Sequence, residues 1–318
     1  MPKSNKYYVG VDIGGTFIKG GVVDWGGNII CTDKLPTEAD GGEERVLQNI
    51  QKLVSDVLKA SNLTSKDVVG IGMGVPGMID SEKGIVMHSG NLRWKNFRIA
   101  EKISALTGLN VKIANDANVA TLAEVRFGAA KGKKNVVMLT LGTGVGGGIV
   151  CNGELYEGNQ SVGAELGHMV IDKNGEMCAC GRRGCLEAYA SATALIRRTK
   201  KAMSEHPESK MWLTYDLNSA SGKTAFEYKD TDAYAKEVVD EYINDLSVGV
   251  TDIVNVFRPE VVILGGGVCA EGDNLVIPLQ RKVDEQIFAR DIGPKTEIIV
   301  AKLGNSAGTL GAASLLME

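Results

Sequence analysis

The sequence predicts an α/β protein built from two halves of similar plan, and three observations lead to this prediction. Strand-like and helix-like apolar patterns alternate along the chain. A strand, a glycine-rich turn and a second strand occur at residues 7–24 and again at 136–151, where Asp12 aligns with Thr140. The length of 318 residues is also large for a single core. Two unrelated hairpins are the alternative explanation of the repeat.

The first half alternates regularly after its hairpin. Apolar residues at helical spacing predict an amphipathic helix at 43–60, and either Asn115 or Asp116 is a natural cap for the last helix of this half. The predicted elements are a helix at 43–60, a buried strand at 68–75, a helix at 97–107, a strand at 111–114 and a helix from 116 to 127.

The second half repeats the alternation with a longer helical part. Residues 204–230 are polar and predict an irregular surface segment. The other predicted elements are a helix at about 191–203, a long helix at about 232–257, a strand at 260–264 and an alanine-rich helix from about 306.

The composition is that of an ordinary globular protein, with 44% hydrophobic and 23% charged residues. The net charge of -4 argues against nucleic acid as the main partner. No apolar run approaches the roughly 20 residues of a membrane helix, and the first residues lack the pattern of a signal peptide. Six cysteines, three of them in one short stretch, predict reduced thiols with a metal site. We therefore expect a cytoplasmic protein.

The first glycine hairpin is a candidate phosphate-binding loop. Gly14 and Gly15 let backbone N–H groups converge on an anion, Thr16 adds a hydroxyl, and Lys19 adds a positive charge. Asp12 supplies a carboxylate that can bind Mg²⁺ through water. A tight hairpin without a ligand is the alternative.

The second hairpin, with Gly142, Thr143 and Gly144, predicts that a polyphosphate is held from two sides. It has no acid at Thr140, so the magnesium carboxylate is expected from the first hairpin alone. Asp116 follows a strand and opens a helix, where a carboxylate can accept the proton of an attacking hydroxyl. A plain helix cap is the alternative reading of the Asn-Asp pair.

A cysteine cluster stands in the segment that runs from Glu165 to Glu187. Three thiolates and one imidazole complete a tetrahedral zinc site, which is typical of a closed, structural ion. Reduced cysteines without a metal are the alternative. The acids Glu165 and Glu187 bracket the cluster and can hold the hydroxyls of a ligand. The expected zinc ligands are His168, Cys178, Cys180 and Cys185.

These residues resemble the ROK family of repressors, open reading frames and kinases. The resemblance rests on DIGGTFIKGGVVD, the ND of IANDANVA, LGTGVGGG, VVILGGGV and ELGHMVIDKNGEMCACGRRGCLE, and it covers nearly the whole chain. It implies two ribonuclease-H-like α/β domains of the actin, hexokinase and Hsp70-like group, flanking a cleft. We expect an N-terminal domain at 1–116 with the terminal helix at 305–318, and a C-terminal domain at 117–304 with the zinc loop at 168–185.

The resemblance also implies a role for each candidate residue. Asp116 is the base that takes a proton from a bound sugar hydroxyl, which then attacks the γ-phosphate of ATP. His168 is implied to serve both zinc and sugar. The implied sugar-binding residues are Gly77, Ser89, Asn91, Asn115, Asp116, Glu165, His168 and Glu187. Gly265 and Gly266 are implied to lie against the adenosine, and a homodimer is common in the family.

The leading functional prediction is an ATP-dependent hexose kinase that phosphorylates glucose at its 6-hydroxyl. An N-acetylhexosamine kinase acting on N-acetylmannosamine or N-acetylglucosamine is the main alternative, and polyphosphate is an alternative donor. A sugar-responsive repressor needs a DNA-binding helix-turn-helix, but only about six residues precede the first predicted strand. A silent sugar sensor has no need of Asp12, Asp116 and both hairpins.

Overall fold

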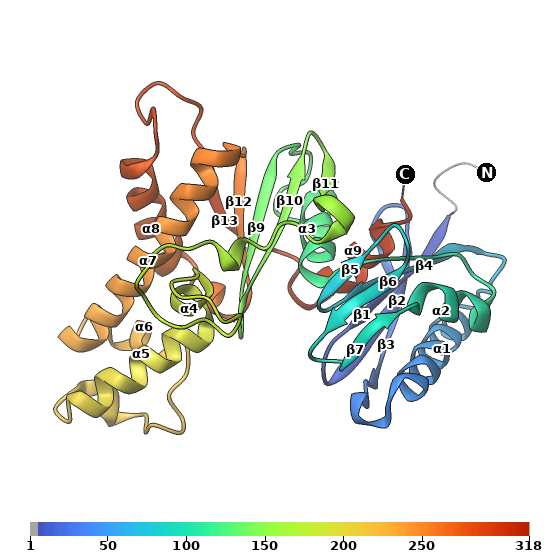
Figure 1. Ribbon diagram of the computed structural model, residues 1–318, viewed down its shortest axis with the longest axis horizontal. Coiled ribbons are helices and arrows are strands. Elements are labelled where there is room, and N and C mark those ends of the chain that lie inside the picture. Colours follow the sequence, from blue (N-terminus) through green and yellow to red (C-terminus); the bar gives the residue numbers. More distant parts are fainter. Residues whose placement is uncertain (1–5, 318) are drawn as a thin grey trace. The chain divides into compact units, whose positions relative to one another are not determined.

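The structure, a computed structural model, describes residues 6–317, which fold as two compact units (Figure 1). Unit 1 comprises Met1–Gly132, Gly148–Ala164 and Lys302–Glu318. Unit 2 comprises Lys133–Gly147 and Glu165–Ala301. The first five residues and Glu318, which fall in the predicted N-terminal domain and its terminal helix, lie outside the described residues.

Unit 1 is built on a five-stranded sheet with the strand order β3-β2-β1-β4-β8. β1 pairs with β2, and β2 with β3, in antiparallel fashion, whereas β1, β4 and β8 run parallel. The glycine hairpin predicted at 7–24 and the strand predicted at 68–75 are confirmed. The strands are β1 (Tyr7–Ile13), β2 (Phe17–Asp24), β3 (Ile29–Pro36), β4 (Val68–Val75) and β8 (Val111–Asn115).

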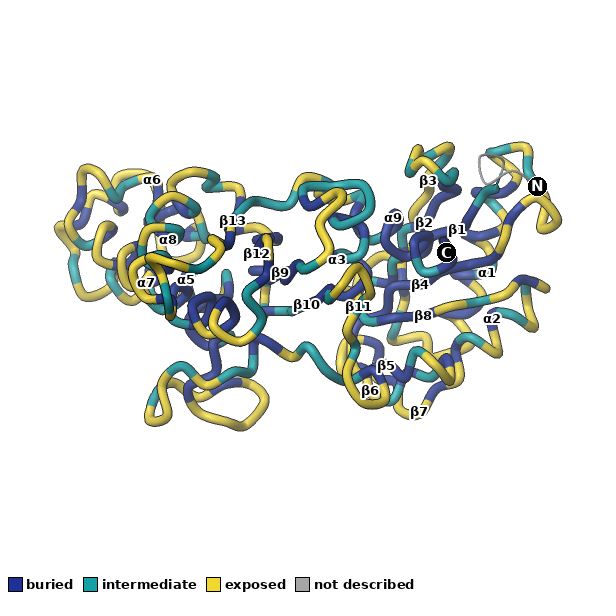
Figure 2. Tube along the Cα trace, turned by 90° about the horizontal axis from the view of Figure 1, so that it is seen from above, coloured by how far each residue is buried: buried dark blue, intermediate teal, exposed yellow. Residues whose placement is uncertain are grey.

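Helices cover both faces of this sheet. α1 (Glu43–Ala60) packs on β2 and β3, and its apolar stripe, which includes Ile50 and Leu53, is fully buried. α9 (Ala307–Ser314) lies on β1 and β4 and packs against α3 (Asp116–Arg126). Figure 2 shows β1 and β4 as largely buried, because helices cover both faces of the sheet at these strands.

Close contact between α9 and the sheet explains two glycines in the strands. A Cβ on Gly10 of β1 would lie 2.0 Å from the carbonyl oxygen of Thr309, and one on Gly72 of β4 would lie 1.7 Å from that of Ala312. Only glycine therefore lets the small-residue helix rest directly on the strands. This packing ties the end of the chain to its first strand.

The helix predicted at 97–107 begins later, as α2 (Ile99–Thr107). Its first predicted residue, Phe97, belongs to a small antiparallel sheet of β5 (Met78–Asp80), β6 (Ile85–Ser89) and β7 (Trp94–Phe97), and the next residue, Arg98, is the N-cap of α2. The ring of Phe97 packs on Trp94, with ring centroids 4.7 Å apart. Strands of three to five residues are too short for a clear alternation, so the pattern did not predict them.

The sheet that runs into unit 2 has the strand order β11-β10-β9-β12-β13, and the division between the units falls inside β10. β9, β12 and β13 are parallel. The repeated plan is confirmed, because β9 ends 128 residues after β1, and β10 begins 128 residues after β2. The strands are β9 (Val136–Leu141), β10 (Val145–Cys151), β11 (Glu154–Tyr156), β12 (Val261–Gly265) and β13 (Glu297–Val300).

The segment 204–230 is not irregular throughout. It contains a 3₁₀-helix at Lys210–Leu213 and α6 (Thr224–Tyr228), which bury Met211 and Phe226. One or two apolar residues per turn are too few to show a period, so composition alone gave a misleading picture. The other α-helices of unit 2 are α4 (Glu187–Ala190), α5 (Ala192–Glu205), α7 (Ala233–Phe257) and α8 (Asp273–Gln286). Of these, α4 and α8 were not predicted.

The predicted domain boundary at residue 116 does not coincide with the division between the units. α3 stays in unit 1 because its Ala123 shares a core cluster with Leu310 of α9. Buried Glu124 of the same helix accepts hydrogen bonds from the backbone N–H groups of Lys302 and Leu303, at 2.9 and 2.8 Å. Within residues 6–317, no helix has the length and apolar character needed to cross a membrane.

Candidate active site

The first glycine hairpin is closed by its own backbone and fastened by a threonine. Gly14 N–H donates to the carbonyl oxygen of Phe17 at 2.9 Å. Thr37, fully buried after β3, donates from Oγ1 to Gly14 O at 2.6 Å and from its N–H to Thr16 O at 2.9 Å. These bonds fix the predicted phosphate loop in one shape. Gly15 and Thr16 remain exposed.

Asp12 lies half-buried at the end of β1, directly opposite Lys19 in the β1–β2 pair. A Cβ on Gly308 of α9 would lie 2.4 Å from Asp12 Oδ2, so the carboxylate packs against that glycine. Burial raises the pKa of Asp12, and the positive charge of Lys19 opposes this rise. A partly desolvated carboxylate of this kind gains from a nearby cation, so the position fits Mg²⁺ carried by a nucleotide.

Asn115 connects two parts of the predicted sugar site within unit 1. It is the N-cap of α3, where its Oδ1 accepts hydrogen bonds from Ala117 N–H at 2.8 Å and Asn118 N–H at 3.3 Å. Its Nδ2 donates to the carbonyl oxygen of Gly77 at 3.1 Å. Gly77 has a φ of 116°, and a Cβ there would lie 2.3 Å from His88 O, so only glycine fits.

Asp116 is the first residue of α3, and its side chain is exposed. Its Oδ1 accepts a hydrogen bond from Ala117 N–H at 3.0 Å. Because β1, β4 and β8 are parallel, their carboxyl ends lie at one edge of the sheet. Asp12 is the last residue but one of β1, and Gly77 and Asp116 follow β4 and β8. Unit 1 thus brings the candidate base, the candidate metal carboxylate and the first predicted phosphate loop to the same edge.

Two further sugar-site candidates lie nearby. Ser89 is buried at the end of β6 and accepts a hydrogen bond from Leu92 N–H at 3.4 Å. Asn91 is exposed, and its Cβ would be 4.0 Å from a Cβ placed on Gly15. The turn that holds Asn91 therefore borders the first phosphate loop.

In unit 2, the second glycine hairpin lies beside the predicted adenosine-binding residues Gly265 and Gly266. Gly142 N–H donates to Gly144 O at 3.0 Å, which closes the hairpin. β12 lies beside β9 with Gly265 opposite Thr140. A Cβ on Gly266, whose φ is 91°, would lie 2.4 Å from Leu141 O. Both predicted nucleotide elements of this unit therefore stand at the carboxyl ends of neighbouring parallel strands.

The four predicted metal ligands converge in unit 2. One donor atom from each of His168, Cys178, Cys180 and Cys185 lies within 4.8 Å of the others. His168 Nδ1 is 3.8 Å from Cys178 Sγ, and the sulfurs of Cys180 and Cys185 are 3.6 Å apart. Sulfur ligands about 2.3 Å from a tetrahedral zinc ion stand about 3.8 Å from each other, so the set fits such an ion.

Burial raises the pKa of the Cys178 thiol to about 12. A metal ion would displace this proton on binding, since the thiolate is the ligand form. His168 meets the cluster through Nδ1, which leaves Nε2 as the ring nitrogen for a second partner. The four side chains of His168, Cys178, Cys180 and Cys185, here called the metal group, could thus hold a metal ion and present an imidazole at the edge of the site.

The two acids that bracket the metal group differ in their surroundings. Glu165 is exposed and precedes the 3₁₀-helix Leu166–His168. Glu187 begins α4, where its Oε2 accepts a hydrogen bond from Val145 N–H at 3.0 Å and its Oε1 one from Cys178 Sγ at 3.4 Å. The carboxylate of Glu187 therefore contacts both the metal group and the second hairpin.

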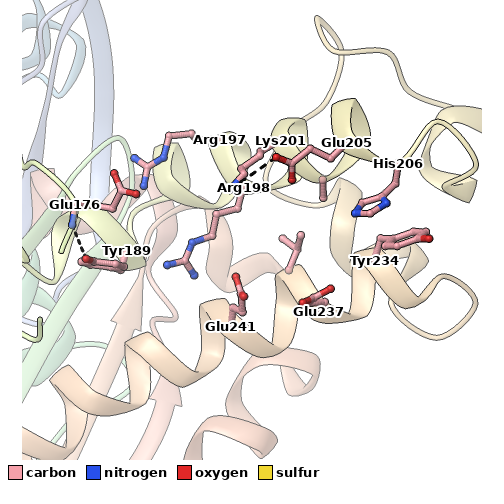
Figure 3. A pocket seen from close by; sticks show the side chains of 12 residues that line it. Glu176, Tyr189, Arg197, Arg198, Lys201, Glu205, His206, Tyr234, Glu237 and Glu241 are labelled. Atoms are coloured by element: carbon pink, nitrogen blue, oxygen red, sulfur yellow. Dashed lines mark hydrogen bonds and ion pairs between the residues drawn. The ribbon is translucent and has the colours of Figure 1, made fainter.

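Sequence reasoning missed the residues that fasten the hairpins, Thr37 and Thr193. Thr193 Oγ1 donates to Thr143 O at 2.8 Å, as Thr37 does to Gly14. Single threonines in loops and at helix starts carry no pattern that would mark them. A cavity of ≈ 540 Å³ between α5 and α7 was also not predicted, and it contains none of the predicted site residues (Figure 3).

The chain is similar to known proteins over nearly its whole length. The ROK family model matches residues 8–318. A glucokinase from Halalkalibacterium halodurans is 37% identical over 318 residues, which cover 99% of this chain and 96% of that protein. A glucokinase from Thermotoga maritima is 38% identical over 321 residues, covering 100% of this chain and 99% of that protein.

A solved structure shares the fold as well. The crystal structure of a ROK family glucokinase from Streptomyces griseus, in complex with glucose and AMPPNP, superposes with a TM-score of 0.81. It is 33% identical in sequence, and the match covers 97% of this chain and 98% of that chain. The likeness therefore extends over both units.

Proposed function

Since the chain belongs to the ROK family, we propose that it is an ATP-dependent glucokinase, which transfers the γ-phosphate of ATP to the 6-hydroxyl of glucose. One observation carries the proposal. Asp116 stands at the same sheet edge as Asp12 and the first phosphate loop, as a kinase base and its nucleotide site must. Full-length similarity to glucokinases at 37% and 38% identity supports glucose as the acceptor.

In the proposed reaction, the Asp116 carboxylate accepts the proton of the sugar 6-hydroxyl. The hydroxyl oxygen then attacks the γ-phosphorus, a new O–P bond forms, and the bond to the bridging β–γ oxygen breaks to release ADP. Asn115 fixes the start of α3 through its two cap bonds and so holds Asp116 in place. Its amide nitrogen carries a second hydrogen that a sugar hydroxyl can accept.

We propose ligand-binding residues in each unit. In unit 1, Gly77, Ser89 and Asn91 would bind the sugar, and Gly14, Gly15, Thr16 and Lys19 would bind the nucleotide phosphates. In unit 2, Glu165, His168 and Glu187 would bind sugar hydroxyls, and Gly142, Thr143, Gly144, Gly265 and Gly266 would bind the nucleotide. Asp12 would hold Mg²⁺ through water, and the ion would supply positive charge for the phosphates.

We propose Zn²⁺ for the metal group, because its four side chains would fill all the positions of a tetrahedral ion and leave none for a reacting water. Its role is then to shape the loop that carries His168 and Glu187. A homodimer and a cytoplasmic location complete the proposal. Light scattering at several concentrations tests the first, and cell fractionation tests the second.

A coupled assay with a panel of sugars tests the function directly. Glucose is expected to give the highest kcat/KM, with phosphate appearing at the 6-position by NMR of the product. A higher kcat/KM for N-acetylmannosamine or N-acetylglucosamine would reassign the acceptor. Replacement of ATP by polyphosphate in the same assay identifies the donor.

A further inference from the structure

The second hairpin is fastened by the segment that directly follows the metal ligand Cys185. Three hydrogen bonds link α4 and the start of α5 to the hairpin. Val145 N–H donates to Glu187 Oε2 at 3.0 Å, and Ala192 N–H donates to Gly142 O at 2.8 Å. Thr193 Oγ1 donates to Thr143 O at 2.8 Å. The backbone of the hairpin is therefore held at three successive points.

The same segment is joined to the metal group from both sides. Glu187 Oε1 lies 3.4 Å from Cys178 Sγ, so one carboxylate contacts a predicted metal ligand and the hairpin at once. The thiol proton shared in this contact is the one that a metal ion would displace. On the other side, Gly167 packs against Val145, since a Cβ on Gly167 would lie 2.1 Å from Val145 O. Gly167 immediately precedes the ligand His168. Glu187 contacts the N–H of Val145 and Gly167 contacts its carbonyl, and these two residues flank the four predicted metal ligands.

The connecting helix α4 has little freedom to absorb a movement of that loop. Tyr189 OH accepts a hydrogen bond from Glu176 N–H at 2.6 Å (Figure 3). Arg197 Nη2 donates to Ala188 O at 2.9 Å. Tyr242 of α7 donates to Ala190 O at 2.7 Å. Because three hydrogen bonds to other segments hold α4, a displacement of the loop before it is passed on to the hairpin.

We propose that Glu187 and Thr193 are positioning residues that couple the metal group to the second hairpin, so that metal occupancy sets the affinity for the nucleotide phosphates. The proposal rests on the function proposed above, in which this hairpin binds ATP. In this proposal the metal ion affects nucleotide binding as well as the shape of the loop that carries His168 and Glu187. A carboxylate has about four acceptor sites, so Glu187 can keep Val145 N–H and still bind a sugar hydroxyl.

Hydrogen–deuterium exchange tests the coupling without any ligand or turnover. Zinc is removed from the full chain with a chelator and restored in a matched sample. Exchange of the backbone amides at 142–145 is expected to become at least about tenfold faster without zinc, because the loop that carries His168 and packs on Val145 through Gly167 is then no longer held by the ion. Unchanged exchange in this peptide, with faster exchange at 168–187, would overturn the coupling.

Nucleotide binding then tests its consequence. The dissociation constant of a non-hydrolysable ATP analogue is measured by calorimetry, without sugar, for wild type, Thr193→Val and Glu187→Ala. Loss of one hydrogen bond is expected to weaken binding about two- to tenfold in each variant. Glu187→Gln keeps an acceptor for Val145 N–H and should restore most of the affinity. Thr199→Val is the matched control, because that hydroxyl donates to Leu195 O within the same helix.

Zinc removal completes a thermodynamic cycle. It is expected to weaken nucleotide binding by wild type about three- to tenfold and to have less effect on Glu187→Ala, whose link is already cut. Equal effects of zinc removal on both proteins, or wild-type affinity in Thr193→Val, would overturn the proposal. A wild-type chain that binds no nucleotide would instead refute the proposed function, while the exchange result would still decide whether metal and hairpin are coupled.

Discussion

Replacement of Asn115 separates its structural role from its catalytic one. In Asn115→Ala, α3 loses the cap acceptor of two N–H groups, which costs about 1 kcal/mol, and the bond to Gly77 O, which contributes about 1 kcal/mol more. Unfolding of unit 1 should therefore become about 2 kcal/mol easier. Asn115→Asp keeps the cap acceptor and loses only the donor, so it should cost about 1 kcal/mol.

Urea denaturation, followed by hydrogen exchange at the α3 amides, measures both changes in the free energy of unfolding. Because α3 begins with Asp116, fraying of its first turn should also lower kcat in Asn115→Ala more than in Asn115→Asp. Equal destabilisation by the two substitutions would refute the capping argument. A loss below about 0.5 kcal/mol in Asn115→Ala would show that these bonds contribute nothing to the fold.

Four further predictions follow from the same geometry. Asp116→Asn should lower kcat by about 10²- to 10⁴-fold, in a coupled assay, while largely retaining glucose affinity by calorimetry. Metal analysis should find one zinc per chain, and Cys180→Ser should lose most of it, raise the glucose KM and lower the melting temperature. Because burial raises the pKa of Asp12, the folded state prefers the protonated carboxyl, so the stability from this group is lost as pH rises through that pKa. In urea unfolding, the free energy of unfolding of Asp12→Asn should therefore rise relative to that of wild type between pH 4 and pH 7. The variant should nevertheless bind Mg²⁺-nucleotide more weakly. Gly144→Ala would place a Cβ 2.3 Å from Glu187 Oε2, so it should raise the KM for ATP more than that for glucose.

Each of these predictions has an outcome that contradicts it. Turnover by Asp116→Asn near the wild-type rate would remove Asp116 as the base. Freshly purified protein without zinc would leave the cysteine cluster as reduced thiols. A pH-independent difference between Asp12→Asn and wild type would show that this carboxyl is not desolvated. An unchanged KM for ATP in Gly144→Ala would show that the hairpin tolerates a displaced Glu187.

Much of the fold follows from local patterns in the sequence. The helix at Glu43–Ala60 and the strand at Val68–Val75 match their predicted limits, since their apolar residues repeat with the helical period or form a continuous buried run. The two glycine hairpins and a cap within the Asn115-Asp116 pair were predicted from neighbouring residues alone. The grouping of the four candidate metal ligands was also predicted, because three of them lie within eight residues and the fourth is ten residues away.

The contacts by which these parts support each other come from the tertiary structure and have no signal in the sequence. Glu187 and Val145 are 42 residues apart, and Thr193 and Thr143 are 50 apart, so no local pattern could pair them. α3 joins unit 1 because Glu124 meets backbone N–H groups 178 and 179 residues further along the chain. The candidate residues for binding phosphate, metal and sugar could be predicted from the sequence, since they depend on side-chain chemistry and short spacing. Their supports depend on contacts that form when distant segments pack, and packing is a property of the folded chain.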